Sequence, residues 1–444
     1  MPKKKNKRER ASAKRLAEKD ANRLDVSLPK KTQPWIKGGR KAIRGDRSNR
    51  RSLSQELNMV NRFRPWEWPK RQVLFFTDLH ADADAFIASL IASGGVKRTG
   101  TADDDFKLTK SGRKARFVIG GDCFDKGPGN LRLLRVINTL RDRGARLKIL
   151  AGNHDIRMLL GIRAIAASKN PRNEHFFVRM GPKMVPFLRE VWEHYLKDGS
   201  GLAGVPRSRE CRRALYPSNK WFKRFPFHAG WVMPSQTAER ELSRMRKKIV
   251  KFSEDCEQAG LSIRMVYAAA MQWRRLFLHR HGEFAWFFDD MALTHREGSF
   301  LFIHAGLDDR IAQVIHDKGL KALNRTFRRH MYGDPFEFYY GPLANMIRTK
   351  YRPVDMPLTT YGATLIHDMG IHAIVHGHLS LRHGQRVMLR QGIVNFQCDT
   401  TMDRNTRKKE GLSGIGAAAT IIDPDRRVSG ISRDYPFQKI FEMK

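Results

Sequence analysis

The sequence has few cysteines and few acidic residues for its length. Its 45 Asp and Glu stand against 84 Lys and Arg, which gives 444 residues a formal net charge of +39. Such a charge favours partners that are polyanions. The four cysteines form no CxxC pair and no disulfide framework, which argues against a secreted scaffold and a cysteine-rich zinc site. They are Cys123, Cys211, Cys256 and Cys398.

Long apolar runs are also lacking. No stretch of the sequence reaches the roughly 20 apolar residues that cross a bilayer. Residues 1–15 contain no apolar segment of the kind found in secretory leaders. We therefore expect no membrane partner and a cytoplasmic location. Hydrophobic residues still make up 41% of the chain, which is too many for a wholly disordered protein.

The basic residues are most concentrated in residues 1–71. This segment holds 23 Lys and Arg against 7 Asp and Glu. Its apolar residues are sparse and follow no sustained period, so we interpret it as a flexible arm with one short helix over 9–23. The aromatic residues of 63–69 are expected to end the arm by packing on the folded body. The arm favours non-specific binding of nucleic acid or another polyanion, with a merely solvated tail as the alternative.

From residue 72 onward, short apolar runs stop at clusters of Asp, His, Asn and Gly. Buried strands that deliver polar residues at their carboxyl ends are typical of sites in α/β proteins. The spacing also predicts helices over 83–92 and 130–143, and further strands and turns over 392–431. The five runs cover residues 73–77, 116–120, 147–151, 299–303 and 371–375.

The segment between the third and fourth runs has a different character. Amphipathic patterns with a helical period recur at about 184–196, 239–259 and 263–278. We interpret residues of about 160–298 as a mainly helical insertion beside the site, within a domain of residues 72–444. Five tryptophans are expected to supply its core: Trp192, Trp221, Trp231, Trp273 and Trp286.

Six side chains from the polar clusters form a candidate metal site. Hard divalent cations bind carboxylate and amide oxygens, and imidazole suits Zn, Fe, Mn and related metals. A mixed set of this size fits two metal ions that share one carboxylate. Such ions, about 3.5–4 Å apart, can hold a hydroxide and clamp a phosphoryl group. The six residues are Asp78, His80, Asp122, Asn153, His304 and His378.

The order of the motifs resembles that of a known family. Asp-x-His, Gly-Asp-x-x-Asp, Gly-Asn-His-Asp, His-Ala-Gly and Gly-His follow one another along the chain. The set is similar to that of the calcineurin-like metallophosphoesterases, over residues 72–160 and 299–435. The resemblance implies an α/β sandwich of two mixed sheets flanked by helices, with the site at the carboxyl ends of the strands.

Within that superfamily, residues 121–128 resemble the phosphoprotein-phosphatase-like branch. The longer stretch of residues 127–161 looks still more like bacterial diadenosine tetraphosphate hydrolases and the related hydrolase-like phosphatases. The resemblance implies two divalent metal ions (Mn, Fe, Zn or similar). Asp78, His80 and Asp122 match the ligands of the first metal, with Asp122 bridging. The ligands of the second are matched by Asn153, His304 and His378.

The resemblance also implies catalytic roles. His154 matches the histidine that protonates the leaving oxygen, oriented by a carboxylate that Asp125 matches. Lys126 stands where an arginine is usual and would hold the phosphate as a point charge, without the bidentate fork of arginine. His376 lies two residues before His378 on the same side of the strand, so it is either a further ligand or a neighbour of one.

Two substrate classes stay open within the enzyme interpretation. The expected reaction is hydrolysis of a phosphate ester or phosphoanhydride by a hydroxide that bridges the metals. The likeness to tetraphosphate hydrolases and the positive charge favour nucleoside polyphosphates or RNA 5′ ends, whereas Asp125 favours a protein serine/threonine phosphatase. In another class, a nucleic-acid-associated binding protein without turnover would have lost ligands, and none of the six is missing. The oligomeric state stays open.

Overall fold

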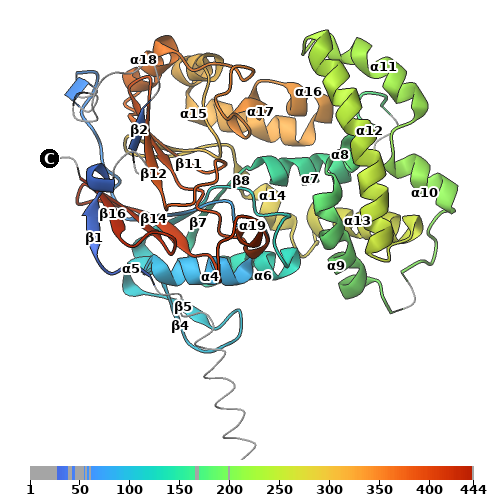
Figure 1. The fold of residues 1–444 in the computed structure, drawn as a ribbon, viewed down its shortest axis with the longest axis horizontal. Helices are drawn as coiled ribbons and strands as arrows, with labels where there is room; N and C mark the ends of the chain where they lie inside the picture. Colours follow the sequence, from blue (N-terminus) through green and yellow to red (C-terminus); the bar gives the residue numbers. More distant parts are fainter. Residues whose placement is uncertain are drawn as a thin grey trace, which may run out of the picture.

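The computed structural model describes residues 28–38, 43–45, 55, 58–59, 62–165, 170–198 and 201–442 (Figure 1). The helix predicted over 9–23 lies outside these residues. Within the described part of the chain, no helix is both long enough and apolar enough to cross a membrane.

Two mixed β-sheets form the centre of the fold (Figure 1). The larger sheet has eight strands, in the order β1 (Thr32–Pro34), β16 (Gln438–Glu442), β15 (Arg427–Ser432), β14 (Ala418–Asp423), β3 (Val73–Phe76), β6 (Arg116–Ile119), β7 (Arg146–Leu150) and β8 (Met291–Ala292). The smaller sheet has six, in the order β2 (Ile43–Gly45), β12 (Arg386–Arg390), β13 (Ile393–Gln397), β11 (Ala373–His376), β10 (Phe300–Phe302) and β9 (His295–Glu297). All five strands predicted from the apolar runs form, with ends within two residues of those expected.

An apolar layer fills the space between the two sheets. Phe75 of β3 points into this layer and contacts Phe302 of β10, with ring centroids 5.7 Å apart. Phe76, the next residue, belongs to the apolar cluster on the other face, where its ring lies 5.7 Å from that of Phe86. Successive side chains of a strand point to opposite faces, so β3 is buried on both sides and consists of apolar residues alone.

Helices cover the outer sides of the sandwich, as Figure 1 shows. On the larger sheet, these are α4 (Ala83–Ala92) and α6 (Asn130–Asp142), both predicted from the sequence. The smaller sheet is accompanied by α15 (Asp309–Tyr332) and α18 (Thr360–Asp368). The remaining short elements of the body are η2 (Trp35–Gly38), α5 (Lys110–Lys114), α16 (Pro335–Tyr340), α17 (Leu343–Met346), α19 (Arg404–Lys409) and the hairpin of β4 (Val96–Arg98) and β5 (Phe106–Leu108).

The segment between β7 and β8 is mainly helical (Figure 1). Trp221 and Trp273 are fully buried in its core, and Trp192 and Trp286 pack partly against that core. Trp231, however, is 89% exposed, because it lies in the turn between two helices, so the prediction that it packs in the core is wrong. The helices are α7 (Asn153–Ala164), α8 (Phe176–Arg179), η3 (Pro182–Met184), α9 (Val185–Tyr195), α10 (Ser208–Leu215), α11 (Asn219–Ala229), α12 (Ser235–Gln258), α13 (Ile263–Leu278) and α14 (Ala285–Asp289).

Part of the segment interpreted as an arm contributes to the sheets. β1 pairs with β16 and β2 pairs with β12, both in parallel. Trp35, next to β1, is only 1% exposed and its ring lies 5.6 Å from that of Phe396. The folded body therefore includes β1 and β2, and a boundary at residue 72 falls too late in the sequence. A strand of three residues is too short to show the side-chain alternation by which a strand is predicted from the sequence.

The aromatic segment before β3 packs on the smaller sheet, as expected. Trp66 and Trp68 both contact Phe300, with ring centroids 5.3 and 5.2 Å apart. Trp66 also contacts His372, at 5.8 Å. These aromatic contacts attach the chain to the body immediately before it enters the larger sheet.

We predict that Trp66→Ala lowers the free energy of unfolding by about 2 kcal/mol, less than a fully buried tryptophan would cost because Trp66 is only partly buried. Trp231→Ala is the matched control, since its indole is 89% exposed, and it should change stability by less than about 0.5 kcal/mol. Denaturant unfolding of both variants measures the difference. Equal losses would contradict the packing role of Trp66.

Candidate metal centre

The polar clusters meet where the carboxyl ends of strands from both sheets converge. Asp78 follows β3, Asp122 follows β6 and Asn153 follows β7 of the larger sheet. His304 and His378 follow β10 and β11 of the smaller sheet. Ligand atoms of Asp122, His304 and His378 lie within 4.8 Å of one another, so the two sheets contribute to one site.

A second group of ligand atoms shares the Asp122 carboxylate. Asp78, His80 and Asp122 also have ligand atoms within 4.8 Å of one another. His80 Nε2 lies 3.8 Å from Asp78 Oδ1 and 3.8 Å from Asp122 Oδ2. These two ligand clusters meet at Asp122, and a third group of nearby atoms, from His80, Asp125 and His154, shares His80 but not Asp122.

The three imidazoles are oriented by backbone carbonyl groups. His80 Nδ1 donates to Phe124 O at 3.1 Å and His304 Nδ1 donates to Gly120 O at 2.8 Å. His378 uses its Nε2 instead, which donates to the carbonyl oxygen of Arg348 at 3.1 Å. A carbonyl only accepts hydrogen bonds, so the bonded nitrogen carries a hydrogen, and the other nitrogen is the one that can ligate a metal when it carries no proton.

Two atoms of the predicted metal ligands are buried and have no hydrogen-bond partner among the described residues, and the same is true of Asp125 Oδ1 and His376 Nε2 beside them. The two ligand atoms are Asn153 Oδ1 and His304 Nε2. A buried acceptor without a partner costs free energy unless another group compensates it. A divalent cation would satisfy both atoms, and the mixture of carboxylate, amide and imidazole donors suits Mn, Fe or Zn. The residues present therefore fit a metal centre.

The loops that carry these residues are strained. Of the eleven non-glycine residues with positive φ in the described chain, seven lie in the loops of the site. Positive φ is unfavourable for residues with a Cβ, and such strain gathers at functional sites. The seven are Asp78, His80, Ala81, Asp122, Asp125, Lys126 and His378.

Asp155, for which sequence analysis proposed no role, fixes two of these loops. Its carboxylate accepts the backbone N–H groups of Asp122 and Cys123, both at 2.8 Å, and of Gly152 at 2.9 Å. The loop after β6 is thereby bound to the start of α7. Asp155 follows His154 in the Gly-Asn-His-Asp motif, but its role depends on donors about 30 residues away, which sequence spacing alone does not reveal.

The Asp122 carboxylate is stabilised as an anion. Burial alone would raise its pKa, but His304 and His154 hold the pKa of Asp122 well below its ordinary value. For His304, burial opposes the charged form, yet Asp122 raises the pKa of this imidazole to about 10. His304 Nε2 lies 3.5 Å from Asp122 Oδ1. A cation bound by both groups would therefore compete with a proton on His304 Nε2.

The pKa of Asp78 is raised, whereas that of Asp122 is lowered. Burial, followed by the charge of Asp399, raises the pKa of Asp78 to about 8. Asp399 itself is buried. It accepts hydrogen bonds from Ser380 Oγ and from the backbone N–H of Thr401, both at 3.1 Å. These hydrogen bonds make Asp399 a structural neighbour of the site.

His154 and Asp125 form a buried pair beside the clusters. His154 Nδ1 donates to Asp125 Oδ2, and His154 Nε2 lies 3.8 Å from Asp122 Oδ2. Burial lowers the pKa of His154 well below its ordinary value and raises the pKa of Asp125 to about 6. The structure thus brings together the two residues expected to form the acid and its orienting carboxylate.

Lys126 is partly exposed at the site, whereas His376 is buried beside it. Lys126 Nζ donates to His80 Nε2 at 2.5 Å. Burial opposes its charge, but Asp122, with Asp399 and Asp78, raises the pKa of Lys126. His376 is fully buried and its Nδ1 donates to Gly377 O at 3.0 Å. Its ring belongs to neither cluster of ligand atoms in the described chain.

Two arginines line a small cavity next to Asn153. The cavity has a volume of about 30 Å³, and Arg157, Tyr339 and Arg348 form part of its wall. The Arg348 guanidinium lies 4.7 Å from the Tyr339 ring centroid. Arg157 and Arg348 carry no motif that marks them.

A sandwich whose strand ends gather carboxylates, histidines and an asparagine defines a metallophosphoesterase. A family model described as calcineurin-like phosphoesterase matches residues 71–379. The chain belongs to this family, and it is a phosphoesterase hydrolase.

Solved phosphatase structures are similar to this chain at low identity. A cold-active protein tyrosine phosphatase is 14% identical, with a TM-score of 0.44 over 86% of this chain and 82% of its own. The corresponding enzyme of a psychrophilic Shewanella species is 12% identical, with a TM-score of 0.41 over 86% and 84%. A protein serine/threonine phosphatase of Saccharomyces cerevisiae is 10% identical, with a TM-score of 0.38 over 88% of each chain. No curated protein sequence matches this chain.

The pKa of Asp78 predicts how metal-free protein responds to pH. The folded chain holds a proton on Asp78 up to about pH 8, whereas the unfolded chain releases it near pH 4. In EDTA, the unfolding free energy of the wild type relative to Asp78→Asn should therefore fall as pH rises from 4 to 8 and then level off.

In EDTA at pH 8, the wild type should be less stable than Asp78→Asn. Added Mn²⁺ should make the wild type the more stable of the two, because the cation binds the ionised carboxylate and not the amide. Chemical denaturation across the pH series measures both effects. A relative stability that rises with pH in EDTA would show that Asp78 folds as a carboxylate without a cation.

Proposed function

We propose that this phosphoesterase hydrolyses a phosphate ester or phosphoanhydride at a dinuclear metal centre. The observation that carries the proposal is the convergence of two ligand clusters on Asp122, beside the His154–Asp125 pair. The first metal would be held by Asp78, His80 and Asp122. The second would be held by Asp122, Asn153, His304 and His378. When bound, two divalent cations supply a hydroxide nucleophile and offset the charge of the phosphoryl oxygens.

His154 is proposed to protonate the leaving oxygen. Its Nε2 faces the centre, 3.8 Å from Asp122 Oδ2, while its Nδ1 is held by Asp125. A carboxylate at Nδ1 fixes the orientation of the ring and stabilises the imidazolium that can donate from Nε2. Asp125 thus acts as a positioning residue for the acid.

Lys126 is proposed to bind the phosphate. Its ammonium group lies against the first ligand cluster, at 2.5 Å from His80 Nε2. Four neighbouring aspartates raise its pKa against the effect of burial. A cation held by His80 Nε2 would replace this contact and would leave the Lys126 ammonium group free to donate to a phosphoryl oxygen. A lysine supplies a point charge with three donors and no planar fork.

The substrates proposed are nucleoside polyphosphates or RNA 5′ ends. The support comes from Arg157 and Arg348, two basic residues that line the same small cavity as Asn153. Guanidinium groups bind phosphate through charge-assisted hydrogen bonds. A substrate with several phosphates would engage the metal centre with one and these arginines with another.

A protein serine/threonine phosphatase is the second candidate. The observation in its favour is the buried Asp125 bonded to His154, because an acid at this position resembles the phosphatase branch more than the hydrolases. A nucleic-acid-associated binding protein that retains the fold without turnover ranks last. It would not need to keep all six ligands together with the His154–Asp125 pair.

Replacement of the proposed acid tests the mechanism. His154→Asn should lower kcat by about 10²–10⁴-fold, the usual contribution of general acid catalysis, while the bound metal stays unchanged because His154 is not a proposed ligand. Asp122→Asn should instead lose metal as well as activity. Steady-state kinetics and elemental analysis of the same samples measure both. Full activity of either variant would refute the mechanism.

A substrate panel with Mn²⁺ separates the two substrate classes. We expect a dinucleoside tetraphosphate to be hydrolysed with a higher kcat/KM than a serine phosphopeptide. Arg157→Gln should lower kcat/KM for the tetraphosphate by about tenfold, the loss of one charge-assisted contact, and leave an aryl phosphate within about threefold. Preference for the phosphopeptide would favour the phosphatase alternative.

A further inference from the structure

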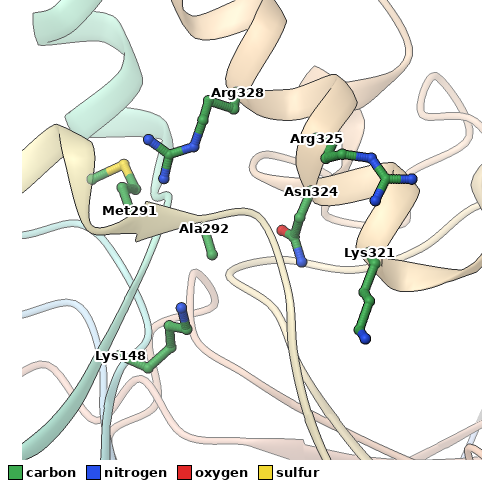
Figure 2. Close-up of a pocket in the computed structure, with 7 residues that line it drawn as sticks. All are labelled: Lys148, Met291, Ala292, Lys321, Asn324, Arg325 and Arg328. Atoms are coloured by element: carbon green, nitrogen blue, oxygen red, sulfur yellow. The ribbon is translucent and has the colours of Figure 1, made fainter.

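A second basic cavity lies apart from the proposed metal ligands, at the edge of the larger sheet. It has a volume of about 370 Å³ and opens beside β8, the last strand of that sheet. Figure 2 shows one cation, Lys148, on the sheet side and three on the helix α15. The cations on α15 are Lys321, Arg325 and Arg328. No proposed metal ligand lines this cavity.

The helix face that carries three of the cations is held in place. Lys321, Arg325 and Arg328 are spaced at i, i+4 and i+7, so they share one face of α15. Asn324, on the same face, fixes the helix to the segment after β8. Its Oδ1 accepts the backbone N–H of Leu293 at 2.9 Å, and its Nδ2 donates to a neighbouring carbonyl at 3.1 Å. The cavity is therefore preformed.

The positive charge of the cavity is not neutralised by the protein. Among the described residues, no carboxylate forms an ion pair with Lys148, Lys321 or Arg325. Arg328 donates only to the backbone oxygen of Asp289, at 2.5 Å. Asp290, the acid that acts on Lys148, is itself paired with an arginine at 3.2 Å.

The sheet side adds to this excess of charge. Lys148 is half-buried, and burial, then Arg116 and Arg328, lowers its pKa. Like charges gathered without counter-charges repel one another, and a bound anion would relieve that repulsion. The four cations would together balance an anion of several negative charges.

We propose that this cavity binds a compact oligophosphate of two or three phosphoryl groups. Lysine and arginine are the side chains that bind phosphate through charge-assisted hydrogen bonds. A volume of about 370 Å³ lies at the small end of the range for small-molecule sites, so a compact anion fits better than a nucleic-acid duplex. Free diphosphate and the polyphosphate tail of a nucleotide share this chemistry.

The test follows local hydrogen exchange in the full-length, metal-loaded protein at low salt. The probes are methylenediphosphonate and β,γ-methylene ATP, in which a methylene group replaces the oxygen bridge between the two terminal phosphorus atoms. We expect either analogue to slow exchange in peptides that cover residues 320–332 of α15. A titration then gives an affinity for this cavity alone, independent of binding at the metal centre.

The variant Lys321→Gln/Arg325→Gln should shift the midpoint of that titration at least tenfold to higher concentration. Both side chains are exposed, so folding should not suffer. Lys220→Gln/Arg240→Gln is the matched control, since it removes two exposed positive charges from the insertion. Its midpoint should change by less than twofold.

Protection by both analogues would support recognition of the phosphates alone. Protection by the nucleotide analogue only would show that the cavity binds the polyphosphate tail of a nucleotide and not free diphosphate. The proposal is overturned if neither analogue protects α15, if the two double variants give the same midpoint, or if only a single-stranded oligonucleotide gives protection. Because the readout is local exchange, failure of the proposed hydrolysis would not affect this result.

Discussion

The Asp122 carboxylate is the contact on which the candidate centre depends, because it joins loops from both sheets. Its Oδ1 accepts the backbone N–H of His154 at 2.9 Å and lies 3.5 Å from His304 Nε2. The loops must approach closely for this, and Gly152 permits it: a Cβ there would lie 2.2 Å from Asp122 Oδ1. Any side chain at residue 152 would push the loop after β6 away from α7 and separate the two ligand clusters.

This arrangement buries several ionisable groups at once, which would be costly without compensation. Without a cation, the protein compensates with protons: burial holds Asp78 largely neutral, while His304 carries a charge beside Asp122. Divalent cations supply the same compensation more effectively, since each offsets two negative charges. Metal affinity and folding stability of this domain are therefore linked through the same carboxylates.

The sequence predicted the strands, and it indicated the candidate ligands at their ends, because a buried strand and the polar residues at its end are adjacent in the chain. It could not predict the contributions that depend on long-range contacts. β1 and β2 join the sheets by backbone pairing alone, Asp155 acts through N–H groups of distant loops, and Arg157 and Arg348 meet at one cavity only after folding. Trp231 was predicted to lie in the core and is exposed, since an apolar residue in a helical segment need not face the core of that segment.

β7 places the two proposed sites at a fixed separation. Lys148 lies within the strand, and Asn153 follows its carboxyl end as the first residue of α7. Because β6 and β8 pair with β7 on either side, this strand cannot shift without breaking sheet hydrogen bonds. An anion at the sheet edge would therefore act on the metal centre through its charge rather than by moving a ligand. Its effect would weaken with salt, whereas a conformational effect transmitted along the backbone would persist.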